Sequence, residues 1–228
     1  TMQTRWHSTD SAQAWLDQAL AFIASAEREA LAARGVFHIV LAGGGTPRQV
    51  YEALARETHD WSRWRVWFGD ERCLPADDPE RNSAMASAAL LDRVAVAATH
   101  AIPGELGPDQ AAAAYADELA TVGDFDLVIL GLGEDGHTAS LFPGGMLTPD
   151  ADVVAVSDAP KPPPERVSLS AARLSRARQV LFLLSGAGKR DALLRWRAGE
   201  PIPAAAIQPQ AGVDVLLAPD LSTLGVFP

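Results

Sequence analysis

Residues 126–143 have the sequence DLVILGLGEDGHTASLFP, and the rest of the chain is best interpreted outward from them. The apolar run at 127–130 is typical of a strand buried on both faces of a sheet. Glycines at 131, 133 and 136 then turn the chain and bring Asp135 and His137 to the mouth of a loop, where a helix of about six residues is expected to start. In an open α/β sheet, ligands bind at the carboxyl ends of the strands. A carboxylate and an imidazole at this place indicate acid–base chemistry.

Strands alternate with helices along the rest of the chain. Helices are expected near residues 10–33 (capped by Ser8, Thr9 or Asp10), 47–57 (with Pro47 first), 82–93, 108–121, 171–177 and 187–197. Strands are expected at 36–41, 65–68, 127–130, 153–156, 167–169, 180–184 and 213–217. This order predicts an α/β, Rossmann-like fold with a mostly parallel sheet and helices on both faces. The proline-rich stretch 157–165 indicates a stiff loop rather than a linker, so we expect residues 1–228 to form a single catalytic domain.

A glycine-rich turn follows the first of these buried strands. Gly43, Gly44 and Gly45 allow the main chain to approach a ligand closely, and Thr46 adds a hydroxyl donor. The helix that follows offers free N–H groups and a partial positive charge. These features predict a phosphate-binding turn, with a tight connection that binds nothing as the alternative.

A charged triplet, Asp70-Glu71-Arg72, closes the strand expected at 65–68. Arg72 is suited to clamp an oxyanion through two hydrogen bonds, and Asp70 to accept hydrogen bonds from sugar hydroxyls. A solvated ion-pair cluster explains the triplet equally well.

Two further cations lie in weaker motifs. Arg166 precedes a short alternating strand, and Lys189 lies in a glycine-containing turn before a helix. Either is a candidate anion contact, although an exposed surface cation is the simpler interpretation of each motif alone.

Other site types fit the sequence less well. The pattern Gly131-x-Gly-x-x-Gly136 matches a dinucleotide fingerprint, with Asp158 where the ribose-binding acid belongs, but the helix expected after it is too short for pyrophosphate binding. The chain has no G-x-S-x-G nucleophile motif, and Cys73 is expected to be an inert, half-buried loop thiol. Histidines 7, 38, 59, 100 and 137 lack zinc-ligand spacing. We therefore expect neither a metal nor a cofactor.

Composition limits the partners. The 228 residues carry a formal net charge of −10, which argues against nucleic acid, and no apolar run reaches the length of a membrane span. One cysteine and the lack of signal-peptide features at the N-terminus favour a cytoplasmic protein. We expect a monomer whose anion site is assembled from a few local cations and N–H groups.

Taken in order, the motifs resemble those of the 6-phosphogluconolactonase family. The segments that carry the likeness are GGGTP (43–47), WFGDER (67–72), GLGEDGHTASLFP (131–143), PPPERVSLS (162–170) and SGAGKRDAL (185–193). Many members have Ser-Asn after Asp-Glu-Arg, whereas this chain has Arg81-Asn82, an added cation whose role the sequence leaves open. The resemblance implies hydrolysis of 6-phospho-D-glucono-1,5-lactone to 6-phosphogluconate.

The resemblance also implies roles for the candidate residues. His137 is expected to be the general base and then the acid, with its neutral form favoured by a helix N-terminus and its imidazolium stabilised by Asp135. Asp135 alternatively fixes only the turn. The glycine turn, Thr46, Arg166 and Lys189 are expected to hold the phosphate, and Arg72 to lie nearer the lactone.

Two other functions remain open at this point. Glucosamine-6-phosphate deaminases resemble the same motifs, but the arginine of Asp-Glu-Arg is typically tyrosine in them, so Arg72 and the segment 138–143 favour the lactonase. A sugar-phosphate sensor without catalysis would not need the pair Asp135 and His137.

Overall fold

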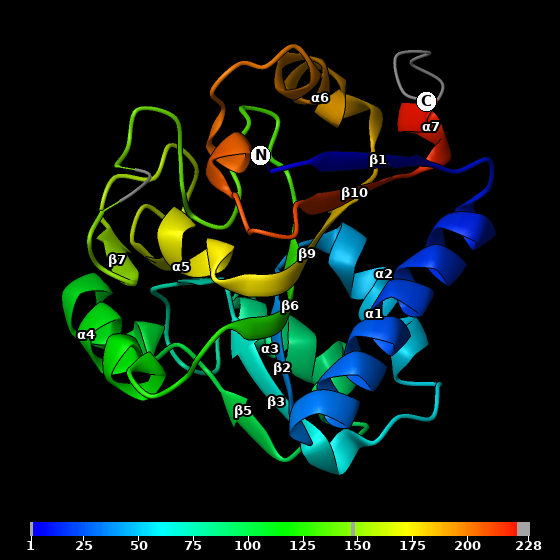
Figure 1. Ribbon diagram of the computed structural model, residues 1–228. Coiled ribbons are helices and arrows are strands. Elements are labelled where there is room, and N and C mark those ends of the chain that lie inside the picture. The colour runs from blue at the N-terminus through cyan, green and yellow to red at the C-terminus, as the bar shows by residue number, and fades with distance from the viewer. Residues whose placement is uncertain (1, 147–148, 223–228) are drawn as a thin grey trace.

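The computed structural model describes residues 2–146 and 149–222, and it contains two sheets (Figure 1). The larger sheet has seven strands in the order β1-β10-β9-β6-β2-β3-β5, and neighbouring strands are parallel throughout. The smaller sheet is antiparallel, in the order β4-β8-β7. The predicted α/β fold with a mostly parallel sheet is confirmed.

The element bounds are as follows. The strands are β1 (Thr4–Ser8), β2 (Phe37–Leu41), β3 (Trp64–Phe68), β4 (Asp70–Arg72), β5 (Ala98–His100), β6 (Phe125–Leu130), β7 (Val153–Val156), β8 (Arg166–Leu169), β9 (Ala177–Leu184) and β10 (Val213–Leu217). The helices are α1 (Ala12–Arg34), α2 (Gly45–Leu54), α3 (Asn82–Ala86), α4 (Pro108–Leu119), α5 (Ala171–Ser175), α6 (Arg190–Arg197) and α7 (Pro219–Ser222).

The middle of the large sheet is apolar because helices cover it on both sides. All six residues of β6 are buried, including Asp126, whose carboxylate accepts hydrogen bonds from Arg34 and from the main-chain N–H of His38. In Figure 1, α1 and α2 lie on one side of the strands and α4 and α5 on the other. Helix α1 ends at Gly35 because this residue adopts the left-handed conformation (φ 74°).

Several local predictions were wrong. The cap of α1 is Ser11, whose side chain accepts from the N–H of Ala14, rather than Ser8, Thr9 or Asp10. Helix α2 begins at Gly45, so Pro47 is its third residue. The helix expected near 82–93 is present, but it consists of α3 and a π-helix at Ser87–Leu91 rather than one regular α-helix. The edge strands β1 and β5 were missed, and the triplet at 70–72 is a strand, β4, rather than a loop.

The strand order creates a crevice between β2 and β6. From β2 the chain moves outward through β3 to β5, then returns to the centre as β6 and continues the other way through β9 and β10. Chain segments leaving β2 and β6 therefore diverge to opposite sides, and the opening between them is where ligands bind in sheets of this kind. The glycine turn after β2 and the Asp135–His137 turn after β6 meet at this opening.

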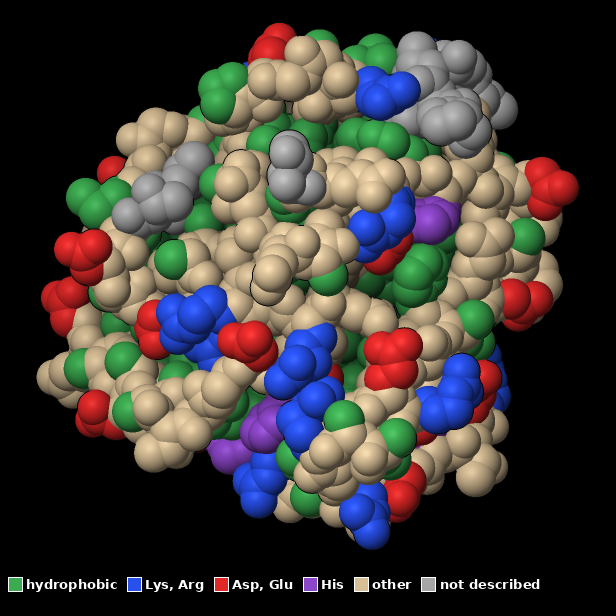
Figure 2. Space-filling model, in the orientation of Figure 1, with side chains coloured by type: hydrophobic (Ala, Val, Ile, Leu, Met, Phe, Trp, Pro, Cys, Tyr) green, Lys and Arg blue, Asp and Glu red, His purple; other side chains and the backbone are tan. Residues whose placement is uncertain are grey.

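The face of the molecule shown in Figure 2 carries charges of both signs. On the face in Figure 2, Lys and Arg side chains are interspersed with Asp and Glu. None of the helices within residues 2–146 and 149–222 combines the length and apolar character that crossing a bilayer requires.

Candidate active site

A cavity of about 240 Å³ lies at the carboxyl ends of β2, β6 and β9. Nine of the ten residues predicted for the site line it: Gly43, Gly44, Gly45, Thr46, Asp70, Arg72, His137, Arg166 and Lys189. The tenth, Asp135, lies behind His137 and is bonded to its ring. Residues up to 146 positions apart in the sequence therefore share one small polar cavity.

His137 is positioned by a tight turn rather than by a helix. The Oδ1 atom of Asp135 accepts the main-chain N–H of His137 at 3.0 Å and lies 2.5 Å from its Nδ1 atom. The main-chain N–H of Gly133 donates to the carbonyl oxygen of His137 at 2.8 Å. A Cβ atom at Gly133 would overlap the His137 ring, so glycine is required there.

The helix expected to start after Gly136 is absent from the described structure. Instead, Thr138 and Leu141 form an isolated bridge, and the Thr138 hydroxyl donates to the carbonyl oxygen of Gly131 at 2.8 Å. These contacts fold the segment back onto the end of β6. The helix N-terminus that was expected to favour neutral His137 is thus not part of the site, and Asp135 is the charge that acts on the ring.

The electrostatics of this pair suit a proton acceptor. Burial by itself would raise the pKa of Asp135, but hydrogen bonds from the main chain and ring of His137 outweigh it and hold that pKa below its usual value. An ionised Asp135 accepts the Nδ1 proton, which leaves a lone pair on Nε2. Nε2 of His137 has no hydrogen bond to any described residue, and the side chain is 21% exposed in the cavity.

The glycine turn forms the opposite wall. Gly44 precedes α2 with φ 101°, a conformation that favours glycine, and the first N–H groups of α2 follow it. The hydroxyl oxygens of Thr46 and Ser185 are 2.7 Å apart, which ties this turn to the end of β9. A Cβ atom at Gly43 would overlap the side chain of Asn82. The turn is therefore fixed from both sides.

Two arginines lie directly opposite one another in the small sheet. Arg72 of β4 pairs with Arg166 of β8 in the antiparallel register. Burial, and then the charge of Arg72, lowers the pKa of Arg166. The Nε atom of Arg72 is buried without a hydrogen bond to a described residue. Like charges placed opposite each other are unfavourable, so an anion bound in the cavity would relieve the repulsion.

Asp70 connects the walls of the site. Its Oδ2 atom accepts from the Ser140 hydroxyl at 2.7 Å, and its Oδ1 atom accepts from the Asn82 amide at 3.1 Å. The carboxylate therefore joins the His137 loop to α3 while it lines the cavity. Each of its oxygens retains a second lone pair for a sugar hydroxyl.

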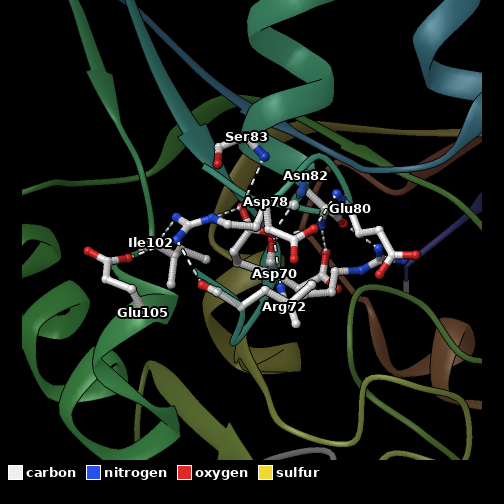
Figure 3. A network of polar contacts seen from close by, with 11 residues as sticks. Asp70, Arg72, Asp78, Glu80, Asn82, Ser83, Ile102 and Glu105 are labelled. Atoms are coloured by element: carbon white, nitrogen blue, oxygen red, sulfur yellow. Dashed lines mark hydrogen bonds and ion pairs between the residues drawn. The ribbon is translucent and has the colours of Figure 1, made fainter. Parts of the chain in front are cut away.

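The added cation at position 81 faces away from the cavity. Arg81 is 3% exposed and lies 3.6 Å from Glu71, 2.8 Å from Glu105 and 2.8 Å from the carbonyl oxygen of Ile102. Figure 3 shows the network in which Glu105 and Ile102 are labelled. An additional contact between Arg81 and an anionic ligand, raised by the sequence, is not supported, and this residue stabilises the scaffold.

Cys73 does not have the environment of a nucleophile. Burial, followed by the charges of Glu165 and Glu71, raises the pKa of its thiol to about 11. The thiolate is the reactive form of cysteine. The expectation of an inert, half-buried thiol is supported.

Apart from Thr138, whose hydroxyl bonds to the main chain of Gly131, sequence reasoning missed three polar residues that line the cavity: Asn82, Lys161 and Ser185. Asn82 was noted in the resemblance but given no role, and Ser185 stands at the start of a recognised segment. Lys161 lies among the prolines that were interpreted only as a stiff loop. None of the three belongs to a pattern that indicates a ligand by itself.

Comparisons with known proteins agree on one family. The family described as "Glucosamine-6-phosphate isomerases/6-phosphogluconolactonase" matches residues 10–216. A protein named 6-phosphogluconolactonase from Synechocystis is 39% identical and covers 90% of this chain and 91% of its own length. One of the same name from Streptomyces coelicolor is 42% identical over 72% of both chains.

Solved structures show the same likeness. A 6-phosphogluconolactonase from Thermotoga maritima superposes with a TM-score of 0.89 and 28% identity, over 95% of this chain and all of that one. A monomeric glucosamine-6-phosphate deaminase has a TM-score of 0.83 at 20% identity, over 96% of this chain and 99% of that one, which shows a shared fold.

Proposed function

The chain belongs to the glucosamine-6-phosphate isomerase/6-phosphogluconolactonase family, and from this premise we propose that it hydrolyses 6-phospho-D-glucono-1,5-lactone to 6-phospho-D-gluconate. The observation that carries the proposal is a single cavity that joins a His–Asp pair with a free ring nitrogen to a glycine turn and four cations. Hydrolysis of a phosphorylated sugar lactone requires a general base and a site that binds the phosphate, and these groups can supply both.

Binding is proposed to begin with the phosphate. The Gly45 and Thr46 turn at the start of α2, Arg166 and Lys189 all line the cavity, and the phosphate-binding end is proposed to lie among them. A dianion at that end would be stabilised by the helix terminus and by the two cations. Holding it there places the lactone ring toward Asp70, Arg72 and His137.

The chemical step is proposed to use His137 twice. Nε2 accepts a proton from a water molecule as the water attacks the lactone carbonyl, and Asp135 stabilises the imidazolium through Nδ1. The carbonyl oxygen becomes an oxyanion, which Arg72 is placed to stabilise. When the tetrahedral intermediate collapses, the imidazolium returns its proton to the departing ring oxygen and the hydroxy acid is formed.

A metal ion is not required by this scheme, because a lactone carbonyl is already electrophilic and histidine supplies the base. Treatment of the protein with EDTA is therefore expected to leave kcat unchanged. A loss of turnover that added Mg²⁺ or Zn²⁺ restores would contradict the scheme.

The function is tested by titrating acid release in a pH-stat with freshly generated 6-phosphogluconolactone, after subtraction of its spontaneous hydrolysis. Enzymatic acid release is expected at a rate proportional to protein concentration. Release of ammonia from glucosamine 6-phosphate, with no acid release from the lactone, would instead establish the deaminase. Neither product, with the sugar phosphate still bound, would indicate a sensor.

A further inference from the structure

The chain contains 19 lysines and arginines, of which only Lys161 and Lys189 are lysine. Both line the cavity described above. Neither ammonium group makes a hydrogen bond or ion pair with any residue in the described ranges. A compact, strongly hydrated ammonium differs from the planar guanidinium that this chain uses elsewhere. Two unpaired lysines at one site therefore indicate a specific task.

Lys161 lies on a closed loop. The main-chain N–H of Ala159 donates to the carbonyl oxygen of Pro164 at 3.0 Å, and three of the four residues after Pro160 are prolines. Proline restricts φ, so the loop has few alternative conformations. The main chain that carries Lys161 is thereby held in one place at the edge of the cavity.

Arg166 holds this loop through hydrogen bonds to its main-chain carbonyl oxygens. Its side chain is buried, and its Nε atom donates to the carbonyl oxygen of Pro163 at 3.1 Å, while Nη2 donates to those of Lys161 and Pro162 at 3.3 Å each. Two of its three nitrogens are thus used on the loop. The guanidinium also lies 5.4 Å from the centre of the Phe142 ring.

We propose that Lys161 contacts the substrate phosphate directly, forming a two-ammonium clamp with Lys189. In this refinement of the scheme above, Arg166 makes no direct contact with the phosphate and is a positioning residue that acts through Lys161. The inference rests on the proposed function for the identity of the ligand. It places the clamp across the cavity, with Lys189 on the turn after β9 and Lys161 on the proline-rich loop before β8.

The charges of the site agree with this arrangement. Burial lowers the pKa of Lys189, Glu134 opposes that shift, and the positive charge of Lys161 lowers it further. Two ammonium groups that repel each other would be stabilised by a dianion between them. Glu134 and Asp135 act on Lys189 only through space, without an ion pair, so the two ammonium groups favour a doubly charged ligand.

Kinetics with two substrates test the clamp. Lys161→Met and Lys189→Met are each expected to raise KM for the phosphorylated lactone roughly tenfold to a hundredfold, as expected for loss of one charged hydrogen bond. Their kcat/KM for unphosphorylated glucono-1,5-lactone is expected to match that of the unmodified protein. Arg190→Met, which removes an exposed cation next to Lys189 but outside the cavity, is the matched control and should change neither value. An equal loss on both lactones, or none on either, would overturn the clamp.

The role of Arg166 is tested by a double-mutant cycle. If Arg166 acts through Lys161, adding Arg166→Met to Lys161→Met should raise KM little beyond the larger single effect. Multiplication of the two single effects would show that Arg166 binds the phosphate independently. Arg166→Lys keeps a charge, but its single nitrogen cannot take the places of both Nε and Nη2 of the planar guanidinium, so it should resemble Arg166→Met.

A footprint on the unmodified protein separates this inference from the proposed function. Acetylation of lysines by an amine-directed reagent, followed by peptide mass spectrometry, should be slowed at both lysines by 6-phosphogluconate and by inorganic phosphate, but not by gluconate. Protection without any lactonase activity would disprove the proposed function and leave the clamp standing. Lactonase activity with Lys161 fully reactive in the presence of 6-phosphogluconate would disprove the clamp alone.

Discussion

Two carboxylate pairs near the carboxyl ends of the strands, Glu71 with Arg81 and Asp135 with His137, differ in burial and in hydrogen bonding. Glu71 is fully buried and accepts three main-chain N–H groups, from Arg72, Asn82 and Ser83, in addition to its ion pair with Arg81. The other pair, Asp135 and His137, is 33% and 21% exposed.

The difference lies in what each pair leaves unbonded. The oxygens of Glu71 accept from main-chain donors of the scaffold, so this network, in which Arg72, Asn82 and Ser83 are labelled in Figure 3, can only stabilise the protein. His137 uses Nδ1 for Asp135 and leaves Nε2 open to the cavity. Exposure together with an unused atom makes Asp135 and His137 the candidate for the proposed reaction, whereas the buried pair has no atom left to react.

The largest expected effect is on catalysis by His137. His137→Ala should lower kcat by about 10²–10⁴, the usual contribution of general acid–base catalysis, with little change in melting temperature because the side chain is partly exposed. The measurement is pH-stat turnover beside a thermal melt. His7→Ala is the matched control, because His7 is also 2.8 Å from a carboxylate, that of Asp214, but lies in β1 outside the cavity. Near-normal kcat in His137→Ala would remove the assignment.

The second prediction concerns the buried pair, where a substitution should lower stability and leave turnover nearly unchanged. Arg81→Met should cost about 3 to 5 kcal/mol of unfolding free energy, because it leaves Glu71 buried without its cation. Turnover of the fraction that remains folded should be close to normal, since Arg81 does not face the cavity. Arg176→Met breaks a partly exposed pair with Asp152 (3.0 Å) and should cost no more than about 1 kcal/mol. Urea unfolding of the three proteins measures the difference. A catalytic defect larger than the stability defect in Arg81→Met would show that the two pairs are not separate.

Much of the site could be predicted from the sequence because its main parts are local. In each glycine turn, the glycines and the polar groups that line the cavity are neighbours in the sequence. Gly44 and His137 could therefore be found from short motifs. The fold followed for the same reason, since buried parallel strands are short continuous apolar runs.

The remaining features depend on contacts that no local pattern encodes. Lys161 reaches the cavity because Arg166 holds its loop, and Ser185 because it meets the Thr46 hydroxyl. β5 is three residues long and was missed because it lacks a strand pattern of its own; it forms by pairing with β3. The helix expected after Gly136 was wrong because the Thr138 hydroxyl bonds back to the end of β6.

The third prediction sharpens the comparison within the reactive pair, by separating the two bonds that Asp135 makes. Asp135→Asn keeps an oxygen that can accept the main-chain N–H of His137 but removes the charge beside the ring. If the charge matters, kcat should fall by roughly 10 to 100-fold, less than in His137→Ala because the imidazole remains. Asp135→Ala, which loses both bonds, is the comparison variant and should be at least as impaired. Normal turnover in Asp135→Asn together with a defect in Asp135→Ala would mean that Asp135 only fixes the turn.

The smallest expected effect concerns pH and the buried pair. Burial raises the pKa of Glu71, and its three main-chain donors and Arg81 offset this only in part. A carboxyl group whose pKa is higher in the folded protein binds protons more strongly there, so its contribution to stability is fully present below its unfolded pKa, about 4.3, and is lost as pH rises through the folded pKa.

Glu71→Gln cannot titrate and therefore lacks this contribution. Relative to the unmodified protein, the loss of unfolding free energy in Glu71→Gln should therefore grow as pH is lowered from 7 toward 5. The loss in Asp135→Asn should not grow, because the pKa of Asp135 is shifted downward and its stabilising charge persists to lower pH. Denaturant titrations at pH 5, 6 and 7 measure both trends. If the loss of unfolding free energy in Glu71→Gln instead shrinks toward pH 5, the three N–H donors and Arg81 outweigh burial. The carboxylate of Glu71 would then be stabilised in its charged form, as that of Asp135 is.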